Sequence, residues 1–197
     1  MLSEYLYRNP DLHSLDIGAN SFDEAGLQSL CSSLQKHGNI RSLYLWANSL
    51  TVRSCEILGT WLESDKALRT LNLAGTGLGE RGLSKLASPL SKHKSLQSLN
   101  ICSNKIGSLE MRLVARVIQN CPELFQLDLS HIEFTDLGAL NLAAAVTHSE
   151  ALGYLNLDYT RFSKTGLNYF YHAARRRQSF SWSMMFHSQS GLSKTII

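Results

Sequence analysis

The sequence predicts an α/β solenoid, with short parallel strands lining its concave face and helices covering its convex face. The first observation is a register of apolar residues 28 positions apart, held by Leu12, Ile40, Leu68, Leu96, Leu124 and Leu152. A fixed period of about 20 to 50 residues is the signature of stacked repeats. Each period opens with alternating apolar and polar residues, typical of a half-buried strand. It continues with apolar residues at helical spacing, such as Leu83, Leu86 and Leu90.

The first element is expected to be a partial repeat over residues 1–11. Leu2 and Leu6 lie 28 residues before Leu30 and Leu34, which sit in the helical half of the next period. The chain is therefore expected to open inside a helix, which is either an N-terminal cover or the cut edge of a longer array. Six full repeats are expected over residues 12–179.

Residues 180–197 are expected to form a degenerate C-terminal repeat or a tail. A seventh period would start at Phe180, but Ser183 stands where an apolar residue is due. In that frame Met185 takes the next core position and Trp182 an exposed one. The segment is interpreted as a capping strand with a tail or as a disordered end, because terminal repeats shield the stack from water.

The shared pattern L-x-x-L-x-L-x-x-N-x-L is the mark of leucine-rich repeats. A period of 28 residues with a full helix resembles the ribonuclease-inhibitor type, over residues 12 to about 178. That type includes sensor arrays of NOD-like receptors, the Ran GTPase-activating protein and tropomodulin-like proteins. The resemblance implies a non-catalytic scaffold that binds a protein or peptide partner. The alternatives are a regulator of a small GTPase that resembles a GTPase-activating protein, or a bacterial effector acting in a host cytosol.

Two breaks in the pattern carry structural expectations. The resemblance implies that the Asn of each repeat bonds the backbone of neighbouring turns, and Ile132 occupies that position in the fifth repeat. We expect the Asn ladder to be loosest there. Pro89 falls inside the third predicted helix, where proline removes a hydrogen bond and clashes with the preceding turn. The helix is expected to kink or stop at this residue.

Composition excludes several classes of protein. The formal net charge of +3 is too small to favour nucleic acid, and the basic run Arg175–Arg177 is interpreted as a solvated helix end. No apolar stretch is long enough to span a membrane, and residues 1–5 do not resemble a signal peptide. The four cysteines show no C-x-x-C spacing, which favours reduced thiols and a cytoplasmic protein.

The exposed strand positions define a candidate partner-binding site. Tyr44 and Trp46 form an aromatic wall, small residues follow in the middle repeats, and an acidic and aromatic wall rises in the last two. Four strand steps from Trp46 to Asp158 span roughly 19 Å, which is wide enough for a helix. The predicted site lacks Lys and Arg, so a basic peptide suits it; the alternative is a set of ordinary solvated strand positions. Its predicted residues are Tyr44, Trp46, Asn72, Asn100, Asp128, His131, Tyr154, Asp158 and Tyr159.

No motif for catalysis, metal or cofactor is present in the sequence. H-E-x-x-H, the phosphate-binding G-x-x-x-x-G-K-S/T and G-x-S-x-G are all missing. His131 and Asp128 approach one another in the predicted array without a poised nucleophile, and Cys102 is interpreted as a solvent-exposed thiol. His37 and His93 are interpreted as polar loop residues. The protein is therefore predicted not to be an enzyme.

Overall fold

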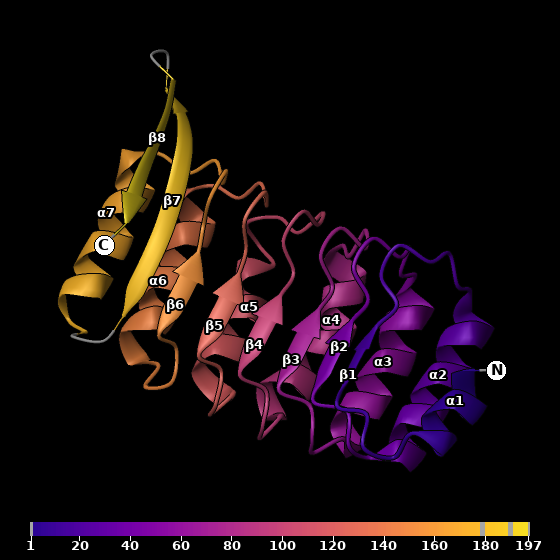
Figure 1. Cartoon of the computed structure of the whole chain (residues 1–197). Helices are drawn as coiled ribbons and strands as arrows, with labels where there is room; N and C mark the ends of the chain where they lie inside the picture. Colours follow the sequence, from indigo (N-terminus) through magenta and orange to yellow (C-terminus); the bar gives the residue numbers. More distant parts are fainter. Residues whose placement is uncertain (1, 178–179, 189–190, 197) are drawn as a thin grey trace.

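The computed structural model describes residues 2–177, 180–188 and 191–196, with side chains as far as Ser183. Short strands and longer helices alternate along the chain (Figure 1). The strands are β1 (Ser14–Asp16), β2 (Ser42–Tyr44), β3 (Thr70–Asn72), β4 (Ser98–Asn100), β5 (Gln126–Asp128), β6 (Tyr154–Asn156), β7 (Ser181–Ser188) and β8 (Gly191–Ile196). The helices are α1 (Leu2–Arg8), α2 (Glu24–His37), α3 (Val52–Ser64), α4 (Glu80–Lys92), α5 (Met111–Asn120), α6 (Asp136–His148) and α7 (Lys164–Arg175).

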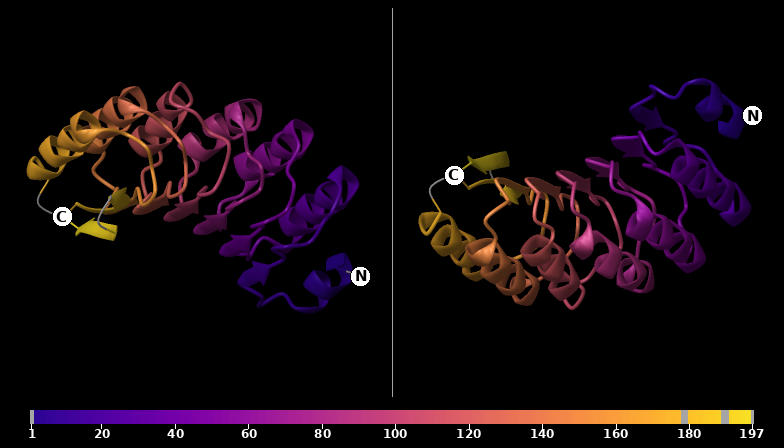
Figure 2. Two further views of the ribbon diagram at one scale, coloured as in Figure 1. Left: turned by 90° about the horizontal axis from the view of Figure 1, so that it is seen from above. Right: turned by 90° about the horizontal axis from the view of Figure 1, so that it is seen from below.

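The strands form one sheet in chain order, from β1 at one edge to β8 at the other. Strands β1 to β7 are parallel, and β8 pairs with β7 in the antiparallel direction. Figure 2 shows the helices on the outside of an arc and the strands on its inside. The predicted solenoid, with strands on the concave face and helices on the convex face, is confirmed.

The core consists of columns of apolar side chains, one from each repeat. Leu43 and Leu71 are opposite each other in the sheet register, and both are fully buried. The column continues through Leu99, Leu127 and Leu155. Each buried leucine side chain contributes about 1.5–3 kcal/mol of hydrophobic stabilisation, so repeats that contact only their neighbours still hold together.

A ladder of buried asparagine side chains ties the turns after the strands together. Nδ2 of Asn48 donates to the carbonyl of Leu45 within its own repeat and to that of Ile17 in the preceding one. Asn104 makes the corresponding bonds to Ile101 and Leu73. Ile132 is buried at this position in the fifth repeat. An isoleucine side chain has no polar group, so it fills the space of the asparagine without making its bonds.

Pro89 does not end α4, which continues to Lys92, so the expectation that the helix stops there is wrong. The proline ring is buried against the neighbouring repeat: a Cβ added to Gly59 would lie 3.3 Å from its Cγ. The same Cβ would lie 3.0 Å from the carbonyl oxygen of Lys85, the acceptor that a proline at position 89 leaves without its helical donor. The helix therefore continues past the proline, whose ring packs closely against Gly59.

The C-terminal strand shows that the expected seventh frame is wrong by one residue. Leu155 pairs with Trp182 and Asn156 with Ser183, a step of 27 residues. Because side chains alternate between the faces of a strand, this shift turns Trp182 into the core, where it is fully buried. Ser183 faces the concave side and bonds the Tyr154 hydroxyl over 2.9 Å. Strand β8 then covers the outer edge of β7. The expectation for Met185 lies outside the described side chains.

Arg177 binds backbone carbonyl groups, so the basic run Arg175–Arg177 is not simply a solvated helix end. Its guanidinium donates to the carbonyls of Leu152 and Val146 through Nη1 and to that of Glu150 through Nη2. It also lies over the ring of Phe180, 5.4 Å from the centroid. Partial burial lowers the pKa of this group from its usual value.

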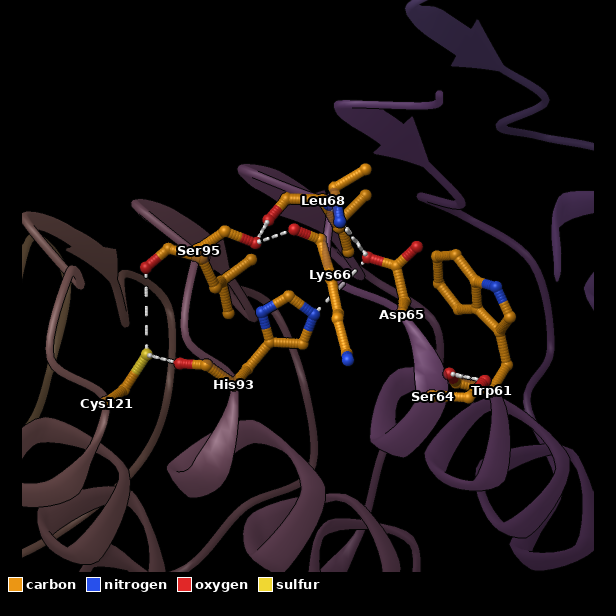
Figure 3. A network of polar contacts seen from close by, with 10 residues as sticks. Trp61, Ser64, Asp65, Lys66, Leu68, His93, Ser95 and Cys121 are labelled. Carbon is orange, nitrogen blue, oxygen red and sulfur yellow. Dashed lines mark hydrogen bonds and ion pairs between the residues drawn. The ribbon is translucent and has the colours of Figure 1, made fainter. Parts of the chain in front are cut away.

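A second polar column runs along the C-terminal ends of the helices, and Figure 3 shows its members Asp65, His93 and Cys121. Its members lie 28 residues apart: His37, Asp65, His93, Cys121, Ser149 and Arg177. Nε2 of His37 contacts the carbonyl oxygen of Asn9 over 3.0 Å, and Sγ of Cys121 donates to the carbonyl of His93 over 3.4 Å. Several members of the column therefore link their loop to the one before it.

His93 follows the end of helix α4 as a polar loop residue, as expected, but it is buried. Its side chain is fully buried, and Nε2 lies 3.4 Å from Oδ2 of Asp65. That contact has the distance of an ion pair without hydrogen-bond geometry, and Nδ1 has no hydrogen-bond partner among the described residues. Oδ2 of Asp65 also accepts from the backbone N–H groups of Ala67 and Leu68. Asp65 thus holds both its own loop and the buried imidazole.

We predict that Asp65→Ala lowers the free energy of unfolding by about 2–4 kcal/mol, because two backbone donors lose their acceptor and a buried imidazole loses the neighbouring carboxylate. Urea denaturation followed by circular dichroism measures the change. Glu63→Ala is the control, because it removes an exposed carboxylate from the same helix end. Equal stability of the two variants would contradict a structural role for Asp65.

Candidate binding site on the concave face

Asn72, Asn100 and Asp128 lie side by side on β3, β4 and β5. In each case one side-chain oxygen accepts from the backbone N–H two residues later, over 2.9 Å. This local bond fixes the chain as it leaves the strand. These residues are therefore partly explained by the fold, and the rest of each polar group faces the concave side.

Tyr44 and Trp46 lie at the end of β2, and Trp46 leans toward the first repeat. Its Nε1 donates to Oδ1 of Asp16 over 3.1 Å. The ring covers Gly18 so closely that a Cβ there would lie 2.1 Å from Cε2 of the indole. Trp46 is still 38 % exposed, while Tyr44 is half-buried. The predicted aromatic wall thus consists mainly of the indole of Trp46, which packs beside β1 and is partly exposed to solvent.

His131 and Tyr159 form a stacked pair in the turns after β5 and β6. Their ring centroids are 4.4 Å apart and the planes differ by 16°. Both residues have positive φ, at 56° and 60°. Side chains of this size rarely adopt this conformation, and Ala19, Ala47 and Ser103 share it in other repeats. The repeat geometry imposes the strain, and it aims the two rings in one direction.

Tyr154 and Asp158 border this pair on β6 and in its following turn. The Tyr154 hydroxyl is used inside the molecule, in its bond to Ser183. Asp158 is different, because its Oδ1 is covered and has no hydrogen-bond partner among the described residues. A covered carboxylate oxygen without a donor is costly, and Oδ1 has too little exposed surface to accept directly from a docked partner.

The predicted site is thus brought together in three parts. Trp46 belongs with Asp16 at one end, Asn72, Asn100 and Asp128 form the middle row, and the stacked rings lie with Asp158 at the other end. Sequence reasoning missed two residues. Gly18 seats the indole of Trp46, and no signal in the sequence marks it for that purpose. Ser183 joins the concave face because of the 27-residue step, which a fixed period of 28 conceals.

The thiol of Cys102 lies two residues after Asn100 and is close enough to Asp128 to feel its charge. Partial burial, followed by the negative charge of Asp128, raises its pKa above the usual value. Such a thiol is mostly protonated at neutral pH, which disfavours a nucleophilic role. Within the described part of the chain, no three His, Cys, Asp or Glu side chains are grouped to hold a metal ion. The arrangement supports recognition by hydrogen bonds and aromatic contact.

Comparison with known proteins agrees with this architecture. Residues 66–87 match the family model described as Leucine Rich repeat. The tropomodulin C-terminal domain from Caenorhabditis elegans superposes with a TM-score of 0.60 at 16% identity, covering 76% of this chain and 92% of that one. The structure of leiomodin-1 Actin-Binding Site 2 gives 0.53 at 14% identity, covering 88% and 86%. No curated protein sequence matches.

The fold is a leucine-rich-repeat solenoid. A third likeness, to TLR13 in complex with ssRNA13, has a TM-score of 0.53 at 17% identity and covers 82% of this chain but 21% of that receptor. At these identities the likenesses describe the fold alone. Among the described residues, no helix combines the length and apolar character needed to cross a membrane.

We predict that Gly18→Ala displaces the indole of Trp46, because the new Cβ overlaps the ring. The loss of the bond to Asp16 costs about 0.5–1.5 kcal/mol. Acrylamide quenching of tryptophan fluorescence is expected to increase, because the displaced indole of Trp46 becomes more exposed. Trp61 and Trp182 are buried and stay shielded, so the change reports on Trp46. The Trp46→Phe variant shows which part of the fluorescence comes from Trp46. Quenching that is unchanged by Gly18→Ala would contradict the described packing of the indole on Gly18.

We predict that Asp128→Asn speeds the alkylation of Cys102 by iodoacetamide at pH 8. Asp128 raises the pKa of the thiol, so neutralising it lowers that pKa and increases the thiolate fraction. The gain should be less than about tenfold, since a tenfold gain requires a full pKa unit. Cys31, Cys55 and Cys121 are buried, and burial raises their pKa values to about 12, 11 and 11. Mass spectrometry locates the label.

Asp158→Asn is the matched control, since it removes the same charge from the same face. An equal effect of both variants would show that a general field, rather than the neighbouring carboxylate, sets the reactivity of Cys102.

Proposed function

We propose that this protein is a non-catalytic interaction scaffold that binds a protein or peptide partner on its concave strand face. The observation that carries the proposal is the row of Asn72, Asn100 and Asp128, which lie side by side on three strands of the concave face and are followed there by Asp158. The stacked rings of His131 and Tyr159 lie in neighbouring turns and offer an aromatic surface beside it. Tyrosine and tryptophan side chains supply many of the residues that dominate binding energy at protein interfaces.

The charges of this face favour a basic partner. Asp16, Asp128 and Asp158 come from three different repeats, and Lys and Arg are missing from the strand positions of the proposed site. A phosphate backbone would meet carboxylates there, so a protein segment suits the face better than nucleic acid or an anionic membrane. The four cysteines are free, which is consistent with the proposed cytoplasmic location.

The period of 28 residues with a helix of up to 14 residues supports assignment to the ribonuclease-inhibitor type of leucine-rich repeat. Actin is a partner worth testing, because the similar leiomodin-1 structure is described as an actin-binding site. That likeness lies in the fold, so actin enters as a first probe beside unbiased capture.

We predict that Tyr44→Ala/Trp46→Ala and Asp128→Asn/Asp158→Asn each weaken partner binding by about tenfold or more, a loss of about 1.4 kcal/mol. The immobilised protein is incubated with actin and, separately, with a cell lysate, and the affinity of each recovered partner is measured by biolayer interferometry. Leu140→Ala on the convex helix α6 is the control, because this leucine is exposed away from the strands.

Unchanged affinity in both concave variants, with native circular dichroism, would remove the concave face as the binding site. Substrate turnover by the purified chain, or GTP hydrolysis stimulated in a small GTPase, would overturn the non-catalytic assignment.

A further inference from the structure

A second surface lies at the opposite end of the strands, one residue before each strand begins. Its members are His13, Arg41, Arg69, Gln97, Phe125 and Gly153, which we name the strand-start row. From Arg41 onward, each member donates its backbone N–H to the carbonyl of the member before it, over 2.7 to 2.9 Å. Adjacent members are therefore spaced as neighbouring strands, about 4.8 Å apart. This row crosses the sheet at right angles to the strands.

Arg41 and Arg69 are exposed neighbours in this row without a carboxylate partner in the described structure. Arg53 pairs with Glu56 and Arg161 with Glu133, whereas other exposed arginines, such as Arg112, also lack an ion pair among the described residues. Arg41 and Arg69 directly precede β2 and β3, and like charges side by side repel each other. Guanidinium groups bind carboxylates through two parallel hydrogen bonds, so the pair is suited to an acidic ligand.

Phe125 is the apolar member of the row, and it is 58 % exposed. Its ring lies on the backbone of Gly153, where a Cβ would be 2.1 Å from Cε2 of the phenylalanine. A glycine at this position is what allows the ring to lie flat with its other face open. Beside it is a surface hollow of 540 Å³, whose lining includes Gln97, Ser98, Pro122, Glu123, Phe125 and Gln126.

We propose that the strand-start row binds an acidic peptide segment that carries an apolar anchor. Two carboxylates pair with Arg41 and Arg69, and an aromatic side chain packs on Phe125 in the hollow. Two strand steps separate Arg69 from Phe125, about 10 Å. An extended chain covers that distance in about three residues. Glu123 lines the hollow, so the anchor end of the peptide is free of acidic groups, which sets its direction.

A single-stranded nucleic acid is the competing ligand, with phosphates on the arginines and a base on Phe125. The charges favour the peptide. A nucleic acid backbone carries a charge at every step, whereas the row offers two arginines followed by Gln97 and a hollow that contains Glu123. This surface is separate from the acidic strand ends of the proposed function, so a partner can engage either one alone.

The test uses fluorescein-labelled acetyl-Glu-Glu-Gly-Ser-Phe-amide and fluorescence anisotropy with the full chain. Saturable binding is expected, and it should weaken tenfold or more in Arg41→Ala/Arg69→Ala and in Phe125→Ala. Arg112→Ala is the matched control, because it removes an exposed arginine from helix α5 on the convex face. Circular dichroism and the thermal midpoint report whether each variant is folded.

Two altered peptides test the two contacts separately. Lys-Lys-Gly-Ser-Phe should bind poorly to the natural chain and recover affinity for Arg41→Glu/Arg69→Glu, while Glu-Glu-Gly-Ser-Ala should lose the dependence on Phe125. Equal binding of the acidic and basic peptides, or acidic-peptide binding that survives in both row variants, would overturn the proposal. Preferential binding of a labelled single-stranded RNA of eight nucleotides would overturn it in favour of nucleic acid.

The outcome is independent of the proposed function. Suppose that a captured partner is lost in the Tyr44/Trp46 variant but retained in the row variants, and that the peptide does not bind. That result would support the proposed scaffold function and rule out this second surface. Peptide binding to the strand-start row, without any partner bound on the concave strand face, would support this second surface and rule out the proposed function.

Discussion

The backbone hydrogen bonds between repeats are the constraint on which the structure depends. Every strand has three residues up to β6, so a repeat cannot fold on its own and is stable only when its N–H and C=O groups meet those of its neighbours. This requirement fixes the rise between repeats. It explains why the buried leucines, the asparagine ladder, the helix-end column and the strand-start row all recur with the period of the backbone.

Most of the fold follows from that period and could be predicted from the sequence. The positions of Leu43 and Leu71, the strand faces and the helices required only counting and the alternation of apolar residues. The predictions were wrong where the packing of neighbouring repeats overrode the 28-residue count or the rule that proline ends a helix. One missing residue before β7 placed Trp182 in the core, and helix α4 continues past Pro89, whose ring packs against Gly59. Neither effect is visible to a rule that treats each repeat alone.

The candidate site was less predictable than the fold. Sequence spacing placed Asn72, Asn100 and Asp128 in one row, but it did not show that each side chain bonds its own backbone. It grouped Tyr44 with Trp46, although the indole belongs with Asp16 and Gly18. Columns give the position of a Cβ, whereas the direction of a long side chain depends on contacts across repeats. Pairs such as His131 and Tyr159 emerge only when both backbones are placed.

The reversal of direction at β8 has a consequence for how such an array can change in length. A new repeat adds a parallel strand beside the last one. The outer edge of β7, however, is already paired with the antiparallel strand β8. Duplication of a 28-residue unit can therefore lengthen the protein between β1 and β7 without disturbing the hairpin. The same unit added after β8 would meet a strand of the wrong polarity. The array can thus gain repeats from within while the β7–β8 hairpin stays unchanged.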